Sequence, residues 1–118
     1  MLSQTVLVNR DATLVQSATI NLPVNSQIVN IICDVLTAYD SATSTTLTVG
    51  TVAAGTQYAS GVNARTAGRT IPTFTAAQLA AMDDIGATTT VVATATSVGQ
   101  PTVGQVRVTV NYVQTVGI

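Results

Sequence analysis

Few side chains in this 118-residue sequence can do chemistry, and Cys33 is the most reactive type among them. A catalytic cysteine needs a base to take its proton, and the sequence contains no His, Lys, Glu or Trp. Cys33 also lies in the most apolar stretch, 28–36, where a thiol is expected to be buried as a small hydrophobic residue. We therefore expect no catalytic role for Cys33, and a single cysteine cannot form an internal disulfide.

The aspartates show no arrangement typical of a metal site or an acid–base pair. Asp83 and Asp84 are adjacent, so their side chains point in different directions, and Asp11, Asp34 and Asp40 lack the spacing of a cation-binding loop. Ser and Thr are abundant, but no base stands ready to activate them. The sequence thus predicts a protein that is not an enzyme, with no catalytic residues, no metal and no cofactor.

Arg65 and Arg69 are two of only four cations, and both fall in the segment 53–73, which we expect to be a long irregular loop. Arginine suits a bidentate contact with a carboxylate across an interface, so both are candidate interface residues. A pair of solvated surface charges is the alternative. The glycines of 50–55 and 61–68 lack the spacing of nucleotide-binding loops, and we expect no small-molecule substrate.

The charge balance excludes some partners. Four Arg and five Asp give a formal net charge of −1, which provides no basic surface for nucleic acid or for an anionic membrane. No segment has the apolar length of a transmembrane helix, and the first residues do not resemble a signal peptide. The length predicts one domain, 1–118.

Thr and Val dominate the sequence, and such β-branched residues favour strands. The segment 27–36 is expected to be a central strand buried on both faces. Two hairpins are expected, one from 5–9 with 13–20 and one from 88–98 with 105–113. In the last of these segments, valines alternate with polar residues, which predicts a half-buried strand.

One helix is expected at 75–82, where Thr75 and Gln78 have the spacing of a capping box and Leu79 shares a face with Met82. The helix should end at Asp83 and Asp84, before Gly86. Together these elements predict an all-β fold, a two-sheet antiparallel sandwich of jelly-roll or immunoglobulin-like type with one long irregular loop and one short helix.

Four segments resemble small structural proteins of tailed bacteriophages, above all the capsid cement (head decoration) proteins. They are ATINLPVNSQIV at 18–29, LTAY at 36–39, TLTVG at 46–50 and PTVGQVRVTVNY at 101–112. The similar segments are strand and turn patterns without catalytic signatures. A tail or fibre-base structural component has similar patterns and remains the alternative.

The resemblance implies a non-enzymatic virion protein, made in the bacterial host cytoplasm, that binds the capsid outer surface. Its partner would be the major capsid protein, whose subunits it would bridge to stabilise the shell, and a homotrimer is expected. A receptor- or glycan-binding module is a further alternative. Such a site needs exposed aromatic rings, and the sequence offers Tyr39, Tyr58, Phe74 and Tyr112, of which Tyr112 is expected in the core.

Overall fold

The computed structural model describes residues 2–11, 13–83, 85–87 and 90–114. These residues form eight strands and one helix. In chain order the elements are β1 (Leu2–Asn9), β2 (Val15–Asn21), β3 (Ser26–Thr37), β4 (Ser44–Gly50), β5 (Ala59–Asn63), β6 (Gly68–Thr70), α1 (Ala76–Asp83), β7 (Thr90–Val98) and β8 (Gln105–Gln114).

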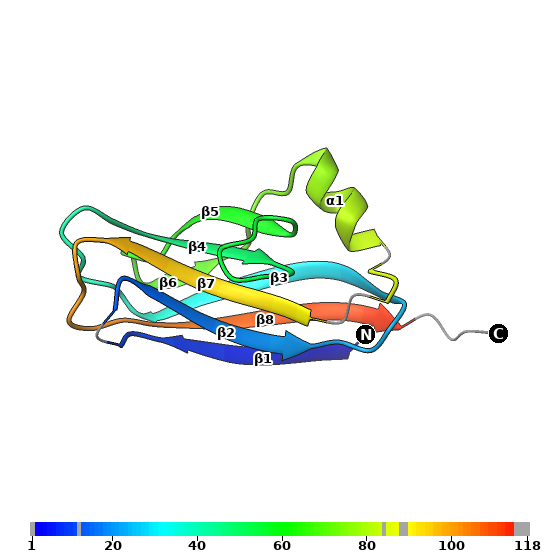
Figure 1. The fold of residues 1–118 in the computed structure, drawn as a ribbon, viewed down its shortest axis with the longest axis horizontal. Helices are drawn as coiled ribbons and strands as arrows, with labels where there is room; N and C mark the ends of the chain where they lie inside the picture. The colour runs from blue at the N-terminus through cyan, green and yellow to red at the C-terminus, as the bar shows by residue number, and fades with distance from the viewer. Residues whose placement is uncertain (1, 12, 84, 88–89, 115–118) are drawn as a thin grey trace.

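The strands form two four-stranded antiparallel sheets packed face to face, so the predicted all-β sandwich is confirmed (Figure 1). Sheet A has the order β1-β8-β3-β6, and sheet B has the order β2-β7-β4-β5. Strands β1 and β2 lie at one side of the sandwich, and β5 and β6 are the edge strands on the other. Helix α1 packs against β3 near one end.

Both predicted hairpins are wrong, because the chain crosses between the sheets at each of these turns. Strand β1 belongs to sheet A and pairs with β8, whereas β2 belongs to sheet B and pairs with β7. Strands β7 and β8 therefore also lie in different sheets. A connection of five or six residues can join neighbours within a sheet or span the roughly 10 Å between packed sheets, and the long-range pairing decides which occurs.

The core lies between the sheets and consists mainly of the inward-facing residues of both, joined by residues of the connections and of α1. Strand β8 contributes Val106, Val108, Val110 and Tyr112, as its alternating sequence predicts. The alternation of strand β3 places Ile31, Cys33 and Val35 in the same core. All of these side chains come from sheet A, and Leu47, Val49, Val91, Ala93 and Ala95 face them from sheet B.

The expectation that 27–36 is buried on both faces is wrong, and burial on both faces is found instead in the part of β7 from Val91 to Ala95. Strand β3 buries one face, while Val29 and Leu36 are exposed and Ile32 is half-buried. In β7, by contrast, Val92 and Thr94 point away from the core and are still only 7% and 0% exposed. A segment outside sheet B covers them, and sequence alternation alone carries no information about such a cover.

Helix α1 begins with the predicted capping box. The Gln78 amide N–H donates to Thr75 Oγ1 at 3.1 Å, and the Thr75 amide N–H donates to Gln78 Oε1 at 2.9 Å. Met82 is buried with Gln78, whereas Leu79 is 52% exposed, so only Met82 of the two apolar residues packs into the core. No helix in the described part of the chain is long and apolar enough to cross a membrane.

The helix ends at Asp83, and Gly86 follows with a positive φ of 60°, as expected for the residue that releases the chain. Asp84, the other predicted end residue, lies outside the described residues.

The segment 53–73 is more regular than expected, since it contains β5 and β6. Strand β5 pairs with β4 in sheet B, and β6 pairs with β3 in sheet A. The segment is thus held by pairing within the chain, and it forms the edge of both sheets on one side of the sandwich.

Candidate interaction surface

The outer face of sheet A is the surface that its four strands turn away from the core. Alternation and register assign its members. They are Ser3, Thr5, Leu7 and Asn9 of β1, Gln105, Arg107, Thr109, Asn111 and Val113 of β8, Gln27, Val29, Asn30, Ile32, Asp34 and Leu36 of β3, and Arg69 of β6. This face is mostly polar, and its side chains are exposed or half-buried.

Hydrogen bonds between side chains of neighbouring strands hold this face in place. Asn111 Nδ2 donates to Asn30 Oδ1 at 2.6 Å, and the hydroxyls of Thr5 and Thr109 share a hydrogen bond of 3.1 Å. Near the opposite end of the strands, Gln105 Nε2 donates to Asn9 Oδ1 at 2.7 Å. Such cross-strand pairs stabilise a sheet and fix the rotamers of the groups they join.

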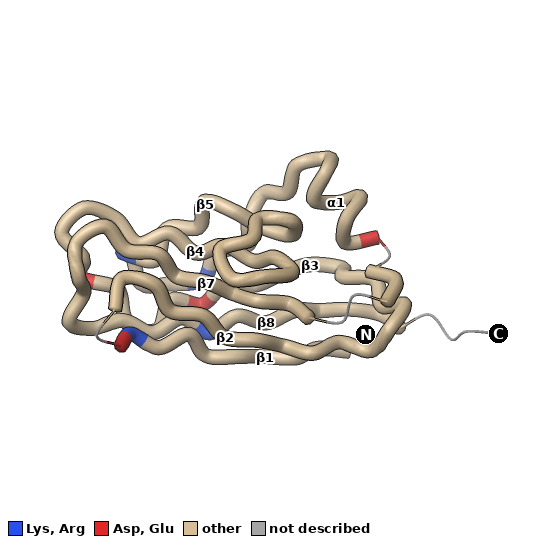
Figure 2. Tube along the Cα trace, viewed as in Figure 1, with Lys and Arg blue, Asp and Glu red and all other residues tan. Residues whose placement is uncertain are grey.

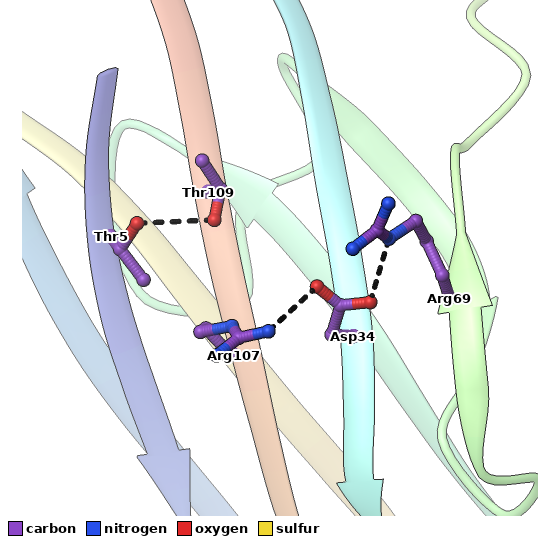
Figure 3. A network of polar contacts seen from close by, with 5 residues as sticks. All are labelled: Thr5, Asp34, Arg69, Arg107 and Thr109. Carbon is purple, nitrogen blue, oxygen red and sulfur yellow. Dashed lines mark hydrogen bonds and ion pairs between the residues drawn. The ribbon is translucent and has the colours of Figure 1, made fainter.

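A row of charges crosses the same face, because the register places Arg107 opposite Asp34 and Asp34 opposite Arg69. Arg69 Nε donates to Asp34 Oδ1 at 3.0 Å, and Arg107 Nη2 donates to Asp34 Oδ2 at 3.3 Å (Figure 3). The Asp34 side chain is 13% exposed, whereas Arg69 and Arg107 are 65% and 44% exposed. The hydrogen bond from Arg69, and then that from Arg107, lower the pKa of Asp34 below its ordinary value.

Arg69 and Arg107 have N–H donors that their pairs with Asp34 do not use. Each arginine uses one nitrogen in the pair with Asp34, and a guanidinium group carries five N–H donors. Two cations and one carboxylate leave the row with an excess positive charge. A carboxylate of a partner could therefore bind here without displacing Asp34.

Arg65 is placed differently from Arg69, although both are interface candidates from the sequence. Arg65 lies between β5 and β6, where its Nη1 donates to the Thr43 carbonyl oxygen at 2.9 Å and its amide N–H donates to Asn63 Oδ1 at 2.9 Å. It thus links its own connection to the one between β3 and β4. The two arginines engage separate partners, and sequence reasoning missed Asp34 and Arg107 because only the strand register brings them beside Arg69.

The outer face of sheet B is partly covered by the connection between β4 and β5. The Ala54 amide N–H donates to Thr94 Oγ1 at 2.9 Å, which fixes this connection over β7. Gln57 Oε1 accepts from the Thr51 amide N–H at 3.1 Å, and the Tyr58 amide N–H donates to the Val49 carbonyl at 3.0 Å. Sheet B therefore uses part of its outer face for packing within the chain.

Most charges outside the row join loops at the end of the sandwich away from α1 (Figure 2). Arg10 Nε donates to the Pro101 carbonyl at 2.8 Å, and Asp40 accepts hydrogen bonds from the Thr102 hydroxyl and from the amides of Thr102 and Val103. The hydrogen bond from the Thr102 hydroxyl is the largest cause that lowers the pKa of Asp40 to about 2. These hydrogen bonds join the connections β1–β2 and β3–β4 to the connection β7–β8.

The remaining candidates for chemistry are buried or dispersed. Cys33 is fully buried, as predicted, and burial raises the pKa of its thiol to about 12. Tyr39, Tyr58 and Tyr112 are in the core and Phe74 packs against it. Among residues 2–11, 13–83, 85–87 and 90–114 we find no pocket and no cluster of three or more His, Cys, Asp or Glu side chains.

The chain was compared with protein-family models, with curated proteins and with solved structures, and no match was found in any of the three comparisons.

Proposed function

We propose that this chain is a non-enzymatic structural protein of a tailed bacteriophage that binds the outside of the capsid and stabilises it as a cement protein. The outer face of sheet A would be the contact surface, and the major capsid protein would be its partner. The observation that carries the proposal is the set of cross-strand hydrogen bonds and ion pairs that holds this face in one arrangement.

A face held in this way suits a static contact. Binding costs about 0.5–1.5 kcal/mol for each flexible side chain that becomes fixed. Asn111, Thr109 and Arg107 are already engaged with neighbouring strands, so less of this cost remains when a second surface covers them. Repeated weak contacts of this kind accumulate when many copies bind one symmetric shell.

The phage-like segments support the proposal because they contribute to this sandwich. The segment 18–29 runs from β2 into β3, and 101–112 leads into β8, a central strand of sheet A. A tail location is the alternative within the same class of protein. Burial of the tyrosines gives no support to the glycan-binding alternative, since stacking on sugar rings needs exposed aromatic surface.

The experiment is binding of the purified protein to expanded, undecorated shells of the phage that encodes it. Thr109→Glu places a charge on the outer face of sheet A, and Thr96→Glu places the same charge on the outer face of sheet B. Both positions lie on central strands. We expect Thr109→Glu to lower the affinity at least about tenfold, which is about 1.4 kcal/mol, and Thr96→Glu to bind as the parent does.

Arginine variants locate the polar contacts on this face. Arg69→Ala is expected to cost about 2–5 kcal/mol of binding if its guanidinium is desolvated against a carboxylate of the shell, and under about 1 kcal/mol if it stays solvated. Arg65→Ala is the matched comparison, since Arg65 bonds the Thr43 carbonyl instead. Equal binding by the parent and by Thr109→Glu would exclude this face, and absence of any binding to shells would reject the proposed function.

A further inference from the structure

Strand β1 is an edge strand of sheet A. Strand β1 pairs with β8 in an unbroken register from Leu2 to Asn9, and no described strand pairs with its other edge. Along such an edge, alternate residues direct their N–H and C=O groups outward. These groups form a template on which another antiparallel strand can add.

Proteins that remain monomeric usually protect such edges with charged residues, proline, bulges or very short strands. Strand β1 has eight residues and contains no charge, no proline and no glycine. Strand β2, on the same side of the sandwich, is also uncharged and pairs with β7 without a break in register. This side therefore carries none of the usual protection along its strands.

The opposite side of the sandwich is protected. Strand β6 has three residues, one of which is Arg69, and the register between β4 and β5 is irregular. Helix α1 packs against β3, and Gln78 Nε2 donates to the Thr56 carbonyl beside β5 at 3.1 Å. Because the chain protects one side in several ways, the lack of protection at β1 is a specific property of that edge.

Exposed apolar side chains accompany the β1 edge. Leu2 and Leu7 of β1 and Leu14 and Val15 at the start of β2 are all among the large hydrophobic side chains that remain exposed. A partner strand along β1 would cover part of this surface and add apolar burial to the backbone hydrogen bonds.

We propose that β1 pairs antiparallel with β1 of a second copy of this chain about a two-fold axis, so that the two A sheets become one continuous sheet of eight strands. A second copy supplies an edge of the same length, without charge and without a bulge, so the unpaired groups of one edge meet their counterparts on the other. No like charges meet along the seam, although each copy carries a net charge of −1.

A two-fold pair differs from the homotrimer that the phage resemblance implies. It does not depend on binding to a shell, so it is tested with the purified protein alone. Sedimentation over a range of protein concentrations is expected to give a dimer that dissociates to a monomer on dilution. A monomer at all concentrations, or a trimer, would overturn the proposal.

Variants of the edge test the surface itself. Two registers keep the faces of the two β1 strands aligned with the greatest overlap, one with Thr5 opposite Thr5 and one with Thr5 opposite Leu7. The double substitution Thr5→Lys with Leu7→Lys puts like charges opposite each other in both registers, and it is expected to abolish the dimer. Thr70→Lys adds a charge at the opposite edge strand and should leave the dimer intact. Circular dichroism and thermal unfolding establish that each variant is folded, and a folded double variant that still dimerises would contradict the proposal.

Cross-linking gives an independent readout. The double substitution Thr5→Cys with Leu7→Cys places thiols across the seam in both registers, and mild oxidation is expected to yield a covalent dimer. The native Cys33 is fully buried and should not react. Thr96→Cys, on the outer face of sheet B, is the control and should stay monomeric on a non-reducing gel. A covalent dimer from Thr96→Cys, with none from the double cysteine variant, would overturn the assignment to β1.

Discussion

The two sheets of the sandwich use their outer faces in different ways. On sheet B, the connection from Thr51 to Gln57 folds over β7, where the Ala54 amide N–H donates to the buried Thr94. On sheet A, the outer side chains are joined to one another across the strands and remain open to solvent or to a partner. Part of the outer face of sheet B therefore contributes to the packing of the fold, and the outer face of sheet A is the one that we propose as a contact surface.

Because of this difference, we expect substitutions on the two outer faces to have different consequences, on folding for sheet B and on binding for sheet A. A substitution in the covered part of the outer face of sheet B, as at Thr94, is expected to change the stability of the chain, because that part belongs to its packing. A substitution on the outer face of sheet A is expected to change binding while the fold remains. The predictions below test this separation, from the largest effect on stability to the smallest.

The largest contrast lies between two adjacent residues of β3. Ile31 is 0% exposed and faces the core, so Ile31→Ala is expected to lower the free energy of unfolding by about 2–5 kcal/mol. Ile32 lies on the outer face of sheet A, and Ile32→Ala is expected to cost about 1 kcal/mol or less. Urea unfolding of both variants measures the difference; equal losses would mean that the outer face also belongs to the core.

The cover on sheet B depends on close backbone approach at Gly50. A Cβ at this position would lie 2.6 Å from the backbone carbon of Gly55 and would meet the Gln57 side chain. Gly50→Ala is therefore expected to displace the connection and to lower the free energy of unfolding by about 1–3 kcal/mol. Unchanged stability, with Thr94 still protected, would show that the cover adapts without strain.

The stability of the fold at low pH tests the contribution of the carboxylates that accept hydrogen bonds. Hydrogen bonds lower the folded-state pKa of Asp34, and they lower that of Asp40 to about 2. Since each folded pKa lies below the ordinary value of 3.8, their contribution is present above pH 3.8 and is lost as the pH falls through the folded pKa. We expect the thermal midpoint to fall between about pH 4 and pH 2.

The variants Asp34→Asn and Asp40→Asn should each make this fall less steep. Thermal scans from pH 5 to pH 2 are the measurement. A fall of the same steepness in both variants would show that these two carboxylates do not govern the acid response.

The smallest effect is expected at Thr48 on sheet B. Its hydroxyl oxygen is buried, and no hydrogen-bond partner for it lies among the described residues. Thr48→Val keeps the shape and removes the unsatisfied hydroxyl, so it is expected to be neutral or to stabilise the chain by up to about 1 kcal/mol. A clear loss of stability in thermal unfolding would indicate that the hydroxyl has a partner after all.

The sequence predicts those features that depend on local chemistry. The alternation of β8 and the capping box of Thr75 with Gln78 follow from spacing alone, and both are found in the structure. The apolar character of 27–36 correctly marks an internal strand and the burial of Cys33.

Long-range pairing accounts for what the sequence could not predict. Consecutive strands suggest hairpins, but only the register of β1 with β8 and of β2 with β7 shows that the chain changes sheets. The same holds for the charged row, since Asp34 and Arg107 are distant in the sequence and meet only through the pairing of β3 with β8. The burial of both faces of β7 depends on a connection that packs onto it from another part of the chain.

Electron cryo-microscopy of the native particle tests most directly whether this chain binds a phage shell through the outer face of sheet A. We expect copies of the sandwich on the outside of the capsid, with Arg69, Arg107 and Thr109 turned toward the major capsid protein and the covered face of sheet B turned to solvent. Density for the chain only in the tail, or copies on the capsid with sheet A facing solvent, would contradict the account.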